Sequence, residues 1–528
     1  MVARTIAAVV LACASSAALA VPDCEGTAAE PDVSRFLARS WGVDERNTRY
    51  QPQSTLSSAN AAGLELAWVY GLASDTPRSL PLVSEDTVFV GDGPRGLVAL
   101  DRANGCERWM FPHDGSISSA IVPAQTAERP MLVFNDRTRG IFAVDARSGT
   151  PIWRTGTDDQ PLAWYSGTSL PIGDTLYAPI SSMEVALAMN PFYGCCTTRG
   201  GVAAFDLATG ARRWFLPTIT EAPKRTGSHW FFVDEYGPSG AAVWGAPSFD
   251  ATRQWLYFGT GQNYSHPTTA TSDAIFAVDA ATGAVQWQRQ FTANDAYTAA
   301  CNNIELNHPN CPKPTGPDVD FGAPTLLVTS PSGRQLLIAG QKSAEVHAMD
   351  PATGDVVWSK RLGRGGIIGG VHWGMAANES LGLLFVPISD KEIDGFPAPG
   401  TPAPGLYALD IETGEQRWVY TRPSRCDETE CVFGLSAAVS AANDVVVMGS
   451  IDGMLEVLHA PSGKLLWAHD AWRDYDAVNG VATRGGAFDA HGAFLADDLL
   501  VVVAGYGYVG RQRGGNALLV FRVPAADE

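Results

Sequence analysis

Three cations in this 528-residue sequence stand where they could bind an anionic ligand. Arg139 and Arg199 each lie in a Thr-Arg-Gly sequence just before an apolar strand, and Lys342 follows the apolar strand Leu336–Ala339. A guanidinium group binds a carboxylate through two parallel hydrogen bonds, and an ammonium group stabilises negative charge that develops on an oxygen. Because the formal net charge is -19, cations directed at one site would be the main source of affinity for an anion.

Hard oxygen ligands occur in three other loops. Glu184 is the only carboxylate in residues 178–194, and Asn263, with Gln262 as an alternative one residue away, follows the strand Trp255–Phe258. Asp295 lies in the loop sequence Thr-Ala-Asn-Asp-Ala-Tyr. Calcium prefers carboxylate and amide oxygens, and a positioned carboxylate can also act as a general base. The competing interpretations are that Asn263 is an ordinary turn residue and that Glu184 and Asp295 are solvated carboxylates on the surface.

Cysteines in the sequence predict local disulfides but no attached haem. Cys301/Cys311 and Cys426/Cys431 would each close a short loop, and a secreted chain permits such bonds. No Cys-x-x-Cys-His sequence occurs, so the chain does not carry its own c-type haem.

The adjacent cysteines Cys195 and Cys196 have two possible arrangements. They could bond to each other, or each could pair with a separate partner such as Cys106 or Cys24. Connectivity cannot be deduced from sequence alone, so both arrangements stay open.

An internal repeat predicts the elements that must position these residues. A short strand is followed by Asp, a turn that ends in Gly, and a Trp four residues later, which is typical of a hairpin. A large indole at one fixed place per repeat would dock each sheet on its neighbour. Trp244 falls outside this pattern, so it could stack on a planar ring, although an ordinary core Trp is the alternative. The repeats are Asp101/Gly105/Trp109, Asp145/Gly149/Trp153, Asp206/Gly210/Trp214, Asp279/Gly283/Trp287, Asp350/Gly354/Trp358, Asp410/Gly414/Trp418 and, with His in place of Asp, His459/Gly463/Trp467.

Two half-repeats remain at the ends of the chain. Leu64–Tyr70 resembles the second half of a repeat, with Trp68 in the docking position, and Asn516–Phe521 resembles the first half. Joined together they would form one further blade and leave no free sheet edge. The sequence therefore predicts an all-β, eight-bladed β-propeller whose ring is closed by the N- and C-terminal strands in one blade.

The N-terminus predicts export. Arg4, the apolar run Thr5–Ala14 and the small-residue pattern Ala18-Leu19-Ala20 form a secretory signal over residues 1–20, with a lipoprotein signal ending at Cys13 as the alternative. We expect residues 21–45 to form an N-terminal extension and residues 46–528 the propeller. No later stretch reaches the roughly 20 apolar residues that span a bilayer. The acidic charge disfavours nucleic acid and anionic lipid and would suit a basic partner.

The repeats and four short motifs resemble a known family. Together with the segment Asn47–Tyr50, the docking tryptophans resemble the quinoprotein alcohol dehydrogenase superfamily, which uses pyrroloquinoline quinone (PQQ). Within it, Cys195–Gly200, Thr260–Ser265, Gly340–Ser343 and His372–Met375 resemble the polyvinyl alcohol dehydrogenase branch. The resemblance runs from about residue 40 to the C-terminus.

This resemblance implies a cofactor site in the central funnel. Trp244 would lie under the plane of the quinone, Lys342 would bind the quinone oxygens, and Arg139 or Arg199 would bind its carboxylates, with Arg139 at the better-matching position. Cys195 and Cys196, as a disulfide, would cover the cofactor.

A calcium ion and a catalytic base follow from the same resemblance. Asn263 and Glu184 would bind the ion, and Asp295 would lie next to it and take the hydroxyl proton of the substrate. Here the chain departs from many relatives, because Tyr297-Thr298 stands where their motif continues Trp-Asp. The cysteine pair departs too, since relatives place it in the preceding blade, where this chain has Asn135-Asp136.

The resemblance implies the oxidation, in the periplasm or outside the cell, of a small or polymeric alcohol to a carbonyl. Polyvinyl alcohol or another secondary alcohol would be the substrate, and a soluble cytochrome c would take the electrons. A non-catalytic propeller scaffold for protein interactions, like the outer-membrane assembly lipoproteins that share the repeat, is one alternative. A related PQQ-dependent dehydrogenase of sugars or aldehydes is the other.

Overall fold

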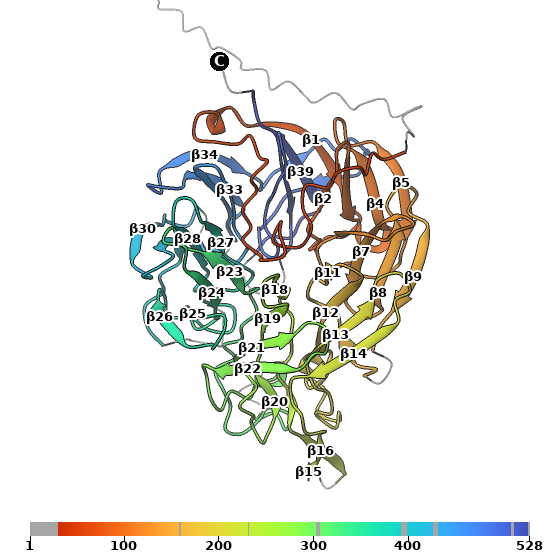
Figure 1. The fold of residues 1–528 in the computed structure, drawn as a ribbon, viewed down its shortest axis with the longest axis vertical. Coiled ribbons are helices and arrows are strands. Elements are labelled where there is room, and N and C mark those ends of the chain that lie inside the picture. The colour runs from red at the N-terminus through yellow and green to blue at the C-terminus, as the bar shows by residue number, and fades with distance from the viewer. Residues whose placement is uncertain are drawn as a thin grey trace, which may run out of the picture.

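The protein is a ring of eight β-sheets. The computed structural model describes residues 30–157, 160–230, 232–302, 307–391, 399–425, 431–507 and 512–525. The sheets follow one another around the ring in chain order, as the colours in Figure 1 show. The prediction of an all-β, eight-bladed propeller is therefore confirmed.

Each blade is an antiparallel sheet with four strands in chain order, and blade 3 has a divided first strand. Blades 1 to 3 consist of β2 (Leu82–Val83), β3 (Thr87–Gly91), β4 (Gly96–Asp101) and β5 (Glu107–Pro112); β6 (Val122–Gln125), β7 (Pro130–Asp136), β8 (Gly140–Asp145) and β9 (Pro151–Thr155); and β10 (Ala163–Trp164), β11 (Leu170–Ile172), β12 (Thr175–Ser182), β13 (Gly201–Asp206) and β14 (Arg212–Pro217). Blades 4 and 5 consist of β18 (Ser248–Asp250), β19 (Trp255–Gly259), β21 (Ala274–Asp279) and β22 (Val285–Gln290); and β23 (Leu326–Thr329), β24 (Gln335–Gly340), β25 (Glu345–Met349) and β26 (Val356–Arg361). Blades 6 and 7 consist of β27 (Ala376–Asn378), β28 (Leu383–Ile388), β29 (Gly405–Asp410) and β30 (Gln416–Tyr420); and β31 (Ser440–Ala442), β32 (Val445–Gly449), β33 (Met454–His459) and β34 (Leu465–Asp470).

Blade 8 closes the ring with strands from both ends of the chain. It consists of β37 (Phe494–Leu495), β38 (Leu499–Ala504), β39 (Ala517–Arg522) and β1 (Glu65–Gly71). Strand β1 pairs antiparallel with β39 from Glu65 opposite Arg522 to Gly71 opposite Ala517, and the two lie side by side in Figure 1. The half-repeats at the two ends thus complete each other as the sequence predicts.

The repeated tryptophans dock each blade on the next. In blade 4, the repeat turn places Gly283 at φ +72°, and Asp279 Oδ1 accepts the backbone N–H of Thr282. Trp287, on the outer strand β22, donates its indole N–H to the carbonyl of Pro351 in blade 5 and packs against Gly354 there. The same contact of a Trp with the turn Gly of the following blade recurs for Trp68/Gly105, Trp109/Gly149, Trp153/Gly210, Trp214/Gly283, Trp358/Gly414 and Trp418/Gly463.

The first strand of each blade lies next to the axis of the ring. Inner strands of neighbouring blades contact each other. Examples are β18 with β23, β27 with β31, and β31 with β37. Because the strands alternate in direction, the loops that lead into the inner strands open on the same face as the loops between the second and third strands. Residues from all eight blades can therefore meet on that face.

A segment near the N-terminus crosses the centre of the ring. We call residues 36–55 the crossing segment. It bonds to the inner strands of six blades. The backbone carbonyls of Glu45, Arg46 and Thr48 accept N–H groups in blades 4, 5 and 6. Gln51 donates through its backbone N–H to blade 7 and through Nε2 to Leu495 in blade 8, and Leu37 N donates to Val83 in blade 1.

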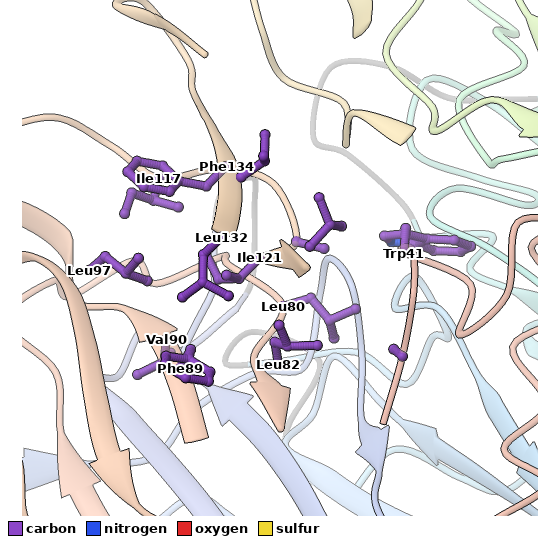
Figure 2. Close-up of a cluster of buried hydrophobic side chains, with 14 of the residues drawn as sticks. Trp41, Leu80, Leu82, Phe89, Val90, Leu97, Ile117, Ile121, Leu132 and Phe134 are labelled. Atoms are coloured by element: carbon purple, nitrogen blue, oxygen red, sulfur yellow. The ribbon is translucent and has the colours of Figure 1, made fainter. Parts of the chain in front are cut away.

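Side chains of the crossing segment fill the centre. Asn47 Nδ2 donates to the carbonyls of Ala246, Pro247 and Thr325, at 3.1 to 3.3 Å. Trp41 is buried in the same apolar cluster as Leu80, Leu82, Ile121 and Leu132 of blades 1 and 2 (Figure 2). The channel is thus closed on one side, beneath the loops that lead into the inner strands.

Additional elements extend the loops of blades 1, 3, 4 and 8. They are the short helix α1 (Glu184–Leu187), the 3₁₀ turns η1 (Ala61–Gly63), η2 (Gly93–Arg95) and η3 (Ala299–Asn302), and the strands β15 (Lys224–His229), β16 (Val233–Gly237), β17 (Ser239–Gly240), β20 (Asn263–Ser265), β35 (Asp474–Tyr475) and β36 (Thr483–Arg484). Within the described ranges, no helix has the length and apolar character that crossing a membrane requires.

Candidate active site

Asp320 joins three of the loops around the axis. Its Oδ2 accepts the indole N–H of Trp244 at 3.1 Å and lies 3.2 Å from Lys342 Nζ, and its Oδ1 accepts the backbone N–H of Gln262 at 3.0 Å. Trp244 precedes β18, Gln262 follows β19, and Lys342 follows β24. Residues 80 positions apart in the chain therefore meet at one buried carboxylate.

Lys342 is a buried cation between two carboxylates. Its Nζ lies 3.0 Å from Asp318 Oδ1 as well as 3.2 Å from Asp320 Oδ2, and 5.9 Å from the centre of the Trp244 ring. Burial lowers the pKa of Lys342, but the attraction of Asp318 and then of Asp320 outweighs it, so the pKa lies above its ordinary value. The ammonium group thus stays protonated across the physiological pH range.

Asp295 is fully buried beside this ion cluster. Its Oδ1 accepts the backbone N–H of Asp318 at 3.1 Å and its Oδ2 that of Val319 at 2.9 Å. Burial raises the pKa of Asp295 to about 6, although these two hydrogen bonds lower it. A carboxylate of this kind is ionised at neutral pH and is more basic than an ordinary Asp, which suits a general base.

The amide of Asn263 is committed to neighbouring groups. Its Oδ1 accepts the backbone N–H of Thr269 at 2.9 Å, and its Nδ2 donates to the carbonyl of Ser239 at 3.1 Å. Its backbone N–H donates to the carbonyl of Asp295 at 3.0 Å. The neighbouring Gln262 donates through Nε2 to the carbonyl of Tyr297 at 3.3 Å, and its Oε1 accepts no hydrogen bond from the described residues. Gln262 thus has the oxygen available for a metal.

Glu184 holds the turn that carries the cysteine pair. Its two carboxylate oxygens accept the backbone N–H groups of Thr197 and Thr198, both of their hydroxyls, and the hydroxyl of Tyr193 at 2.6 Å. A carboxylate offers about four lone-pair positions, so five donors fill them. The described geometry gives Glu184 a structural role and leaves it no oxygen for calcium.

Cys195 and Cys196 form a disulfide with each other. The pair is buried in a cluster with Ala242 and Tyr264, and Trp244 packs against that cluster. The cysteine pair lies in blade 3, one blade later than the resemblance implies, but it still lies close to Trp244, the candidate stacking residue.

The local disulfide between Cys301 and Cys311 is present as predicted. Cys431 and Cys106 are also disulfide-bonded. Cys426, the partner that the sequence predicts for Cys431, lies outside the described residues.

Arg139 and Arg199 have partners away from Asp320. Arg139, whose side chain is 41% exposed, forms an ion pair with Asp114. Arg199 donates to the carbonyls of Ile219 and Thr220, each at 3.0 Å. The structure therefore brings together Trp244, Lys342 and Asp295, with the main chain of Asn263 adjoining them, and places the two arginines elsewhere.

Other polar residues of the site were not expected from the sequence. Asp318 and Asp320 flank Val319 in a loop whose charges look like an ordinary solvated turn. Arg78 and Trp373 lie in loops that lead into β2 and β27, and the Arg78 guanidinium lies 5.0 Å from the centre of the Trp373 ring. Their common signal is a position three to eight residues before an inner strand, which becomes informative only once the blades are known.

The site contains more acid than base. Asp273 is buried with no hydrogen-bond partner on either carboxylate oxygen among the described residues. Burial and then the negative charges of Asp295, Asp320 and Asp318 raise its pKa well above the ordinary value. Asp273, Asp295, Asp318 and Asp320 are thus four buried acids that act on one another, while Lys342 pairs with Asp318 and Asp320, and a divalent cation would relieve the repulsion among the carboxylates. No three His, Cys, Asp or Glu side chains in the described part of the chain are grouped to hold a metal by themselves.

A cavity of about 900 Å³ opens next to Asp295. Tyr297, Gly316, Pro317 and Val319 line it, and a side chain at Gly316 would lie 2.1 Å from Asp295 Oδ1. The loop that carries the Cys301–Cys311 disulfide forms another wall. The volume is that of a ligand-binding cleft, so a substrate could approach Asp295 from this side.

Comparison with protein families gives two overlapping matches. Residues 38–299 match the family model described as "Glucose/ethanol/alcohol dehydrogenase, beta-propeller domain". Residues 271–511 match the model described as "Outer membrane protein assembly factor BamB".

Two curated proteins are similar over nearly the whole chain. The chain is 30% identical to a polyvinylalcohol dehydrogenase of Sphingopyxis sp. (strain 113P3) over 95% of its length and 77% of that protein. It is 32% identical to a polyvinylalcohol dehydrogenase of a Pseudomonas species over 95% of its length and 79% of that protein. The crystal structure of quinohemoprotein alcohol dehydrogenase from Comamonas testosteroni matches 95% of this chain and 82% of that chain with a TM-score of 0.64, at 18% identity, which shows a common fold.

Proposed function

The chain belongs to the PQQ-dependent alcohol dehydrogenase β-propeller family, and from this we propose that it oxidises secondary alcohols, those of polyvinyl alcohol included, to carbonyls. The observation that carries the proposal is the convergence of Trp244, Lys342 and Asp295 around one buried carboxylate, Asp320. The substrate is supported by the two relatives whose names give polyvinyl alcohol. Electrons then pass to an external cytochrome c, and the exported protein works in the periplasm.

The residues present fit a quinone with several carboxylates. Trp373 Nε1 and Arg78 Nε are buried N–H donors that have no hydrogen-bond acceptor among the described residues. Buried donors of this kind are rare in folded proteins unless a ligand or water accepts from them. Trp244 offers an aromatic surface and Lys342 a permanent positive charge, so these four residues would hold an anionic, planar ring. Arg139 and Arg199 remain candidates for the carboxylates from sequence alone.

A calcium ion fits the excess of buried acid. Asp295 and Gln262 would bind it, the latter through the oxygen that has no protein donor, and bound quinone oxygens would complete the shell. We prefer Gln262 to Asn263 and to Glu184 because the oxygens of those two side chains already accept hydrogen bonds from protein groups.

The chain itself performs positioning and proton transfer. When bound, the quinone supplies the two-electron acceptor. Asp295 takes the hydroxyl proton of an alcohol that enters through the adjoining cavity, since its pKa of about 6 leaves it ionised at neutral pH. Lys342 remains protonated and can donate a hydrogen bond to an oxygen on which negative charge grows. The partly buried Trp244 would shield one face of a bound quinone from water.

Reconstitution tests the proposal. Purified protein is incubated with PQQ and calcium, and the quinone absorption band and dye-linked oxidation of a panel of secondary alcohols and polyvinyl alcohol are measured. We expect Asp295→Asn to keep the absorption band and to lose about 10²- to 10⁴-fold in kcat, the usual contribution of a general base. Asp355→Asn is the control, because that side chain is 73% exposed on a distant turn. A protein that forms no band would refute the proposal.

The BamB-type match raises the alternative of a non-catalytic scaffold. Such a scaffold needs the tryptophan contacts between blades, but it has no need of buried donors without acceptors or of a buried lysine between two carboxylates. The same reconstitution separates the two functions, and the substrate panel separates alcohol from sugar or aldehyde oxidation.

A further inference from the structure

Exposed aromatic side chains gather at one place outside the central site. Phe192, Trp230 and Phe232 are 66%, 46% and 69% exposed, and every other Phe and Trp among the described residues is buried or half-buried. The ring centres of Phe192 and Trp230 lie 5.3 Å apart, and those of Trp230 and Phe232 lie 6.5 Å apart. Met189, which is 52% exposed, lies in the same loop as Phe192. We call these four residues the outer patch.

The hairpin of β15 and β16 presents one half of the outer patch. Trp230 directly follows β15 and Phe232 directly precedes β16, and the two strands project beyond the ring at the lower edge of Figure 1. His229, the last residue of β15, donates through Nε2 to the carbonyl of Pro191 at 2.8 Å. This bond joins the hairpin to the loop that carries the other half, so the two halves are held together before any ligand binds.

That loop is fastened to a wall of the cavity beside Asp295. His308 Nε2 donates to the carbonyl of Met189 at 3.0 Å, and Asn310 Nδ2 donates to three further carbonyls of the loop. These three belong to Ala188, Asn190 and Tyr193, at 2.9 to 3.3 Å. Both His308 and Asn310 are buried, and His308 lines the cavity together with the Cys301–Cys311 disulfide. Residues 307–311 thus connect the cavity with the loop of the outer patch.

The outer patch is electrically neutral in a strongly acidic protein. Residues 188–194 include no charged side chain, and on the hairpin Lys224 and Arg225 balance Asp234 and Glu235. Arg225 and Asp234 form an ion pair at 2.7 Å. A basic protein partner is attracted to acidic surface, of which this chain with its formal charge of -19 has plenty elsewhere. A neutral aromatic surface instead suits an uncharged ligand that binds through apolar contacts.

A neutral hydroxylated polymer has the matching chemistry. Polyvinyl alcohol is an uncharged carbon chain with a hydroxyl on every second carbon, so its C–H groups can pack on aromatic rings while its hydroxyls stay in water. Such a chain is far longer than the cavity, which measures about 900 Å³. The part of the chain that does not react must therefore lie along the outside of the protein.

We propose that the outer patch binds the segment of a hydroxylated polymer that extends from the cavity. This inference rests on the proposed function, of which it names the polymer-binding site. Contact at the patch makes the approach of the next hydroxyl to Asp295 intramolecular, which raises the effective concentration of substrate there. Contacts far from the reacting carbon are the same before and during the reaction, so they lower KM for the polymer and leave kcat unchanged.

Polymer binding can be measured without cofactor. Isothermal titration calorimetry of the cofactor-free protein with fully hydrolysed polyvinyl alcohol compares the wild type with the double variant Phe192→Ala/Phe232→Ala. We expect the double variant to bind about 10- to 100-fold more weakly, because two stacking surfaces are lost. Phe232→Tyr, which keeps the ring, should bind like the wild type.

The matched control is Val419→Ala/Leu465→Ala, which shortens side chains that are 43% and 41% exposed on the outer strands β30 and β34. It should bind the polymer like the wild type. Substitutions at exposed positions change the stability little, so all these variants remain folded. Equal polymer binding by the wild type and Phe192→Ala/Phe232→Ala would overturn the proposal. So would a wild type that dimerises through the patch, as seen when sedimentation shows a dimer that this double variant lacks.

Kinetics of the reconstituted enzyme separate this inference from the proposed function. For polyvinyl alcohol we expect Phe192→Ala/Phe232→Ala to raise KM by about 10- to 100-fold with kcat unchanged. For isopropanol, which is too small to reach the patch, neither constant should change. An active enzyme with the same polymer KM in both proteins would refute the outer patch alone. A protein that binds the polymer through the patch but forms no quinone band would refute the proposed function and leave the polymer-binding site standing.

Discussion

At the scale of single residues, the ammonium of Lys342 is the ion-pair partner of Asp318 and Asp320, two buried acids that are expensive to keep ionised inside a protein. In Lys342→Met, Asp318 and Asp320 lose that partner while they remain buried. Removal of one member of a buried ion pair costs about 3–5 kcal/mol in the free energy of unfolding. We expect this loss in urea denaturation of the cofactor-free protein. Lys464→Met, at an exposed turn of blade 7, should change it by less than about 0.5 kcal/mol. Equal urea midpoints for the two variants would contradict the ion cluster.

His491 predicts a dependence of stability on pH. Its Nδ1 accepts the indole N–H of Trp41 at 2.9 Å, and its Nε2 donates to the carbonyl of Ser118 at 3.1 Å. Burial lowers its pKa to about 3; the hydrogen bond to Ser118 opposes this, and the charges of Arg78 and Arg49 lower the pKa further. Since the unfolded chain takes up this proton near pH 6.5 and the folded chain does not, stability falls as the pH decreases from 6.5 towards 3.

The variant His491→Gln isolates this effect, because an amide can keep both hydrogen bonds and does not titrate. Between pH 7 and pH 5, the wild type should lose about 2 kcal/mol more unfolding free energy than the variant. Urea denaturation at the two pH values measures the difference. Parallel losses in both proteins would show that His491 is not held neutral by the fold.

Part of the site could be predicted from the sequence. Trp244, Lys342 and Asp295 stand in short motifs that resemble a family, and the structure places all three around Asp320. Asp320 itself and Asp318 could not be found, because a loop Asp becomes functional through burial next to other blades. Asn263 and Gln262 differ by a single position, and the direction of a β-bridge decides which amide oxygen stays available. The sequence alone does not predict which of the two amide side chains this bridge leaves without a hydrogen-bond donor.

At the scale of the elements, the contact between a Trp and the turn Gly of the next blade is the repeated joint of the ring. Gly354 has φ +73°, and a Cβ there would lie 2.6 Å from Trp287. Gly333 has φ +85°, but a Cβ there would meet no atom within 4 Å. The substitution Gly354→Ala therefore adds a steric clash to the backbone strain that Gly333→Ala also causes. We expect Gly354→Ala to be less stable than Gly333→Ala by about 1–3 kcal/mol in urea denaturation. Equal stabilities would mean that the indole can move away without loss.

The repeats explain why the blades could be predicted and the additions could not. Period-two apolar strands, a turn Gly with positive φ and a docking Trp are local features that recur in every blade. The hairpin of β15 and β16 occurs once, so no second copy identifies it. The crossing segment has no periodic pattern, and its bonds reach partners up to 450 residues away, as between Trp41 and His491. Only the assembled ring provides those acceptors.

At the scale of the whole molecule, the crossing segment encloses the site from one side of the ring, and the loops between strands enclose it from the other side. Trp41, Asn47 and Arg49 fill the axis from one side, and Arg49 alone donates to the carbonyls of Val439 and Ala493 and the hydroxyl of Ser440. The buried acids, Lys342 and His372 lie on the opposite side, in loops between strands. A closed floor keeps bulk water out of the channel, which strengthens every electrostatic interaction above it.

Strand β39 closes the ring, because it pairs with β1 on one side and with β38 on the other. The stability of the whole ring therefore depends on this last strand. A chain that ends after Asn516 lacks β39, so β1 loses the partner it has from Glu65 to Gly71, and β38 loses its neighbour as well. Two unpaired strand edges then face solvent in the same gap, and such edges pair with other chains. We expect this truncation to aggregate in size-exclusion chromatography, whereas a chain that ends at Ala525 should elute like the full-length protein. A monodisperse product with native circular dichroism from the shorter chain would show that seven blades close without the eighth, and that the docking tryptophans, rather than strand pairing between the two ends, hold the ring together.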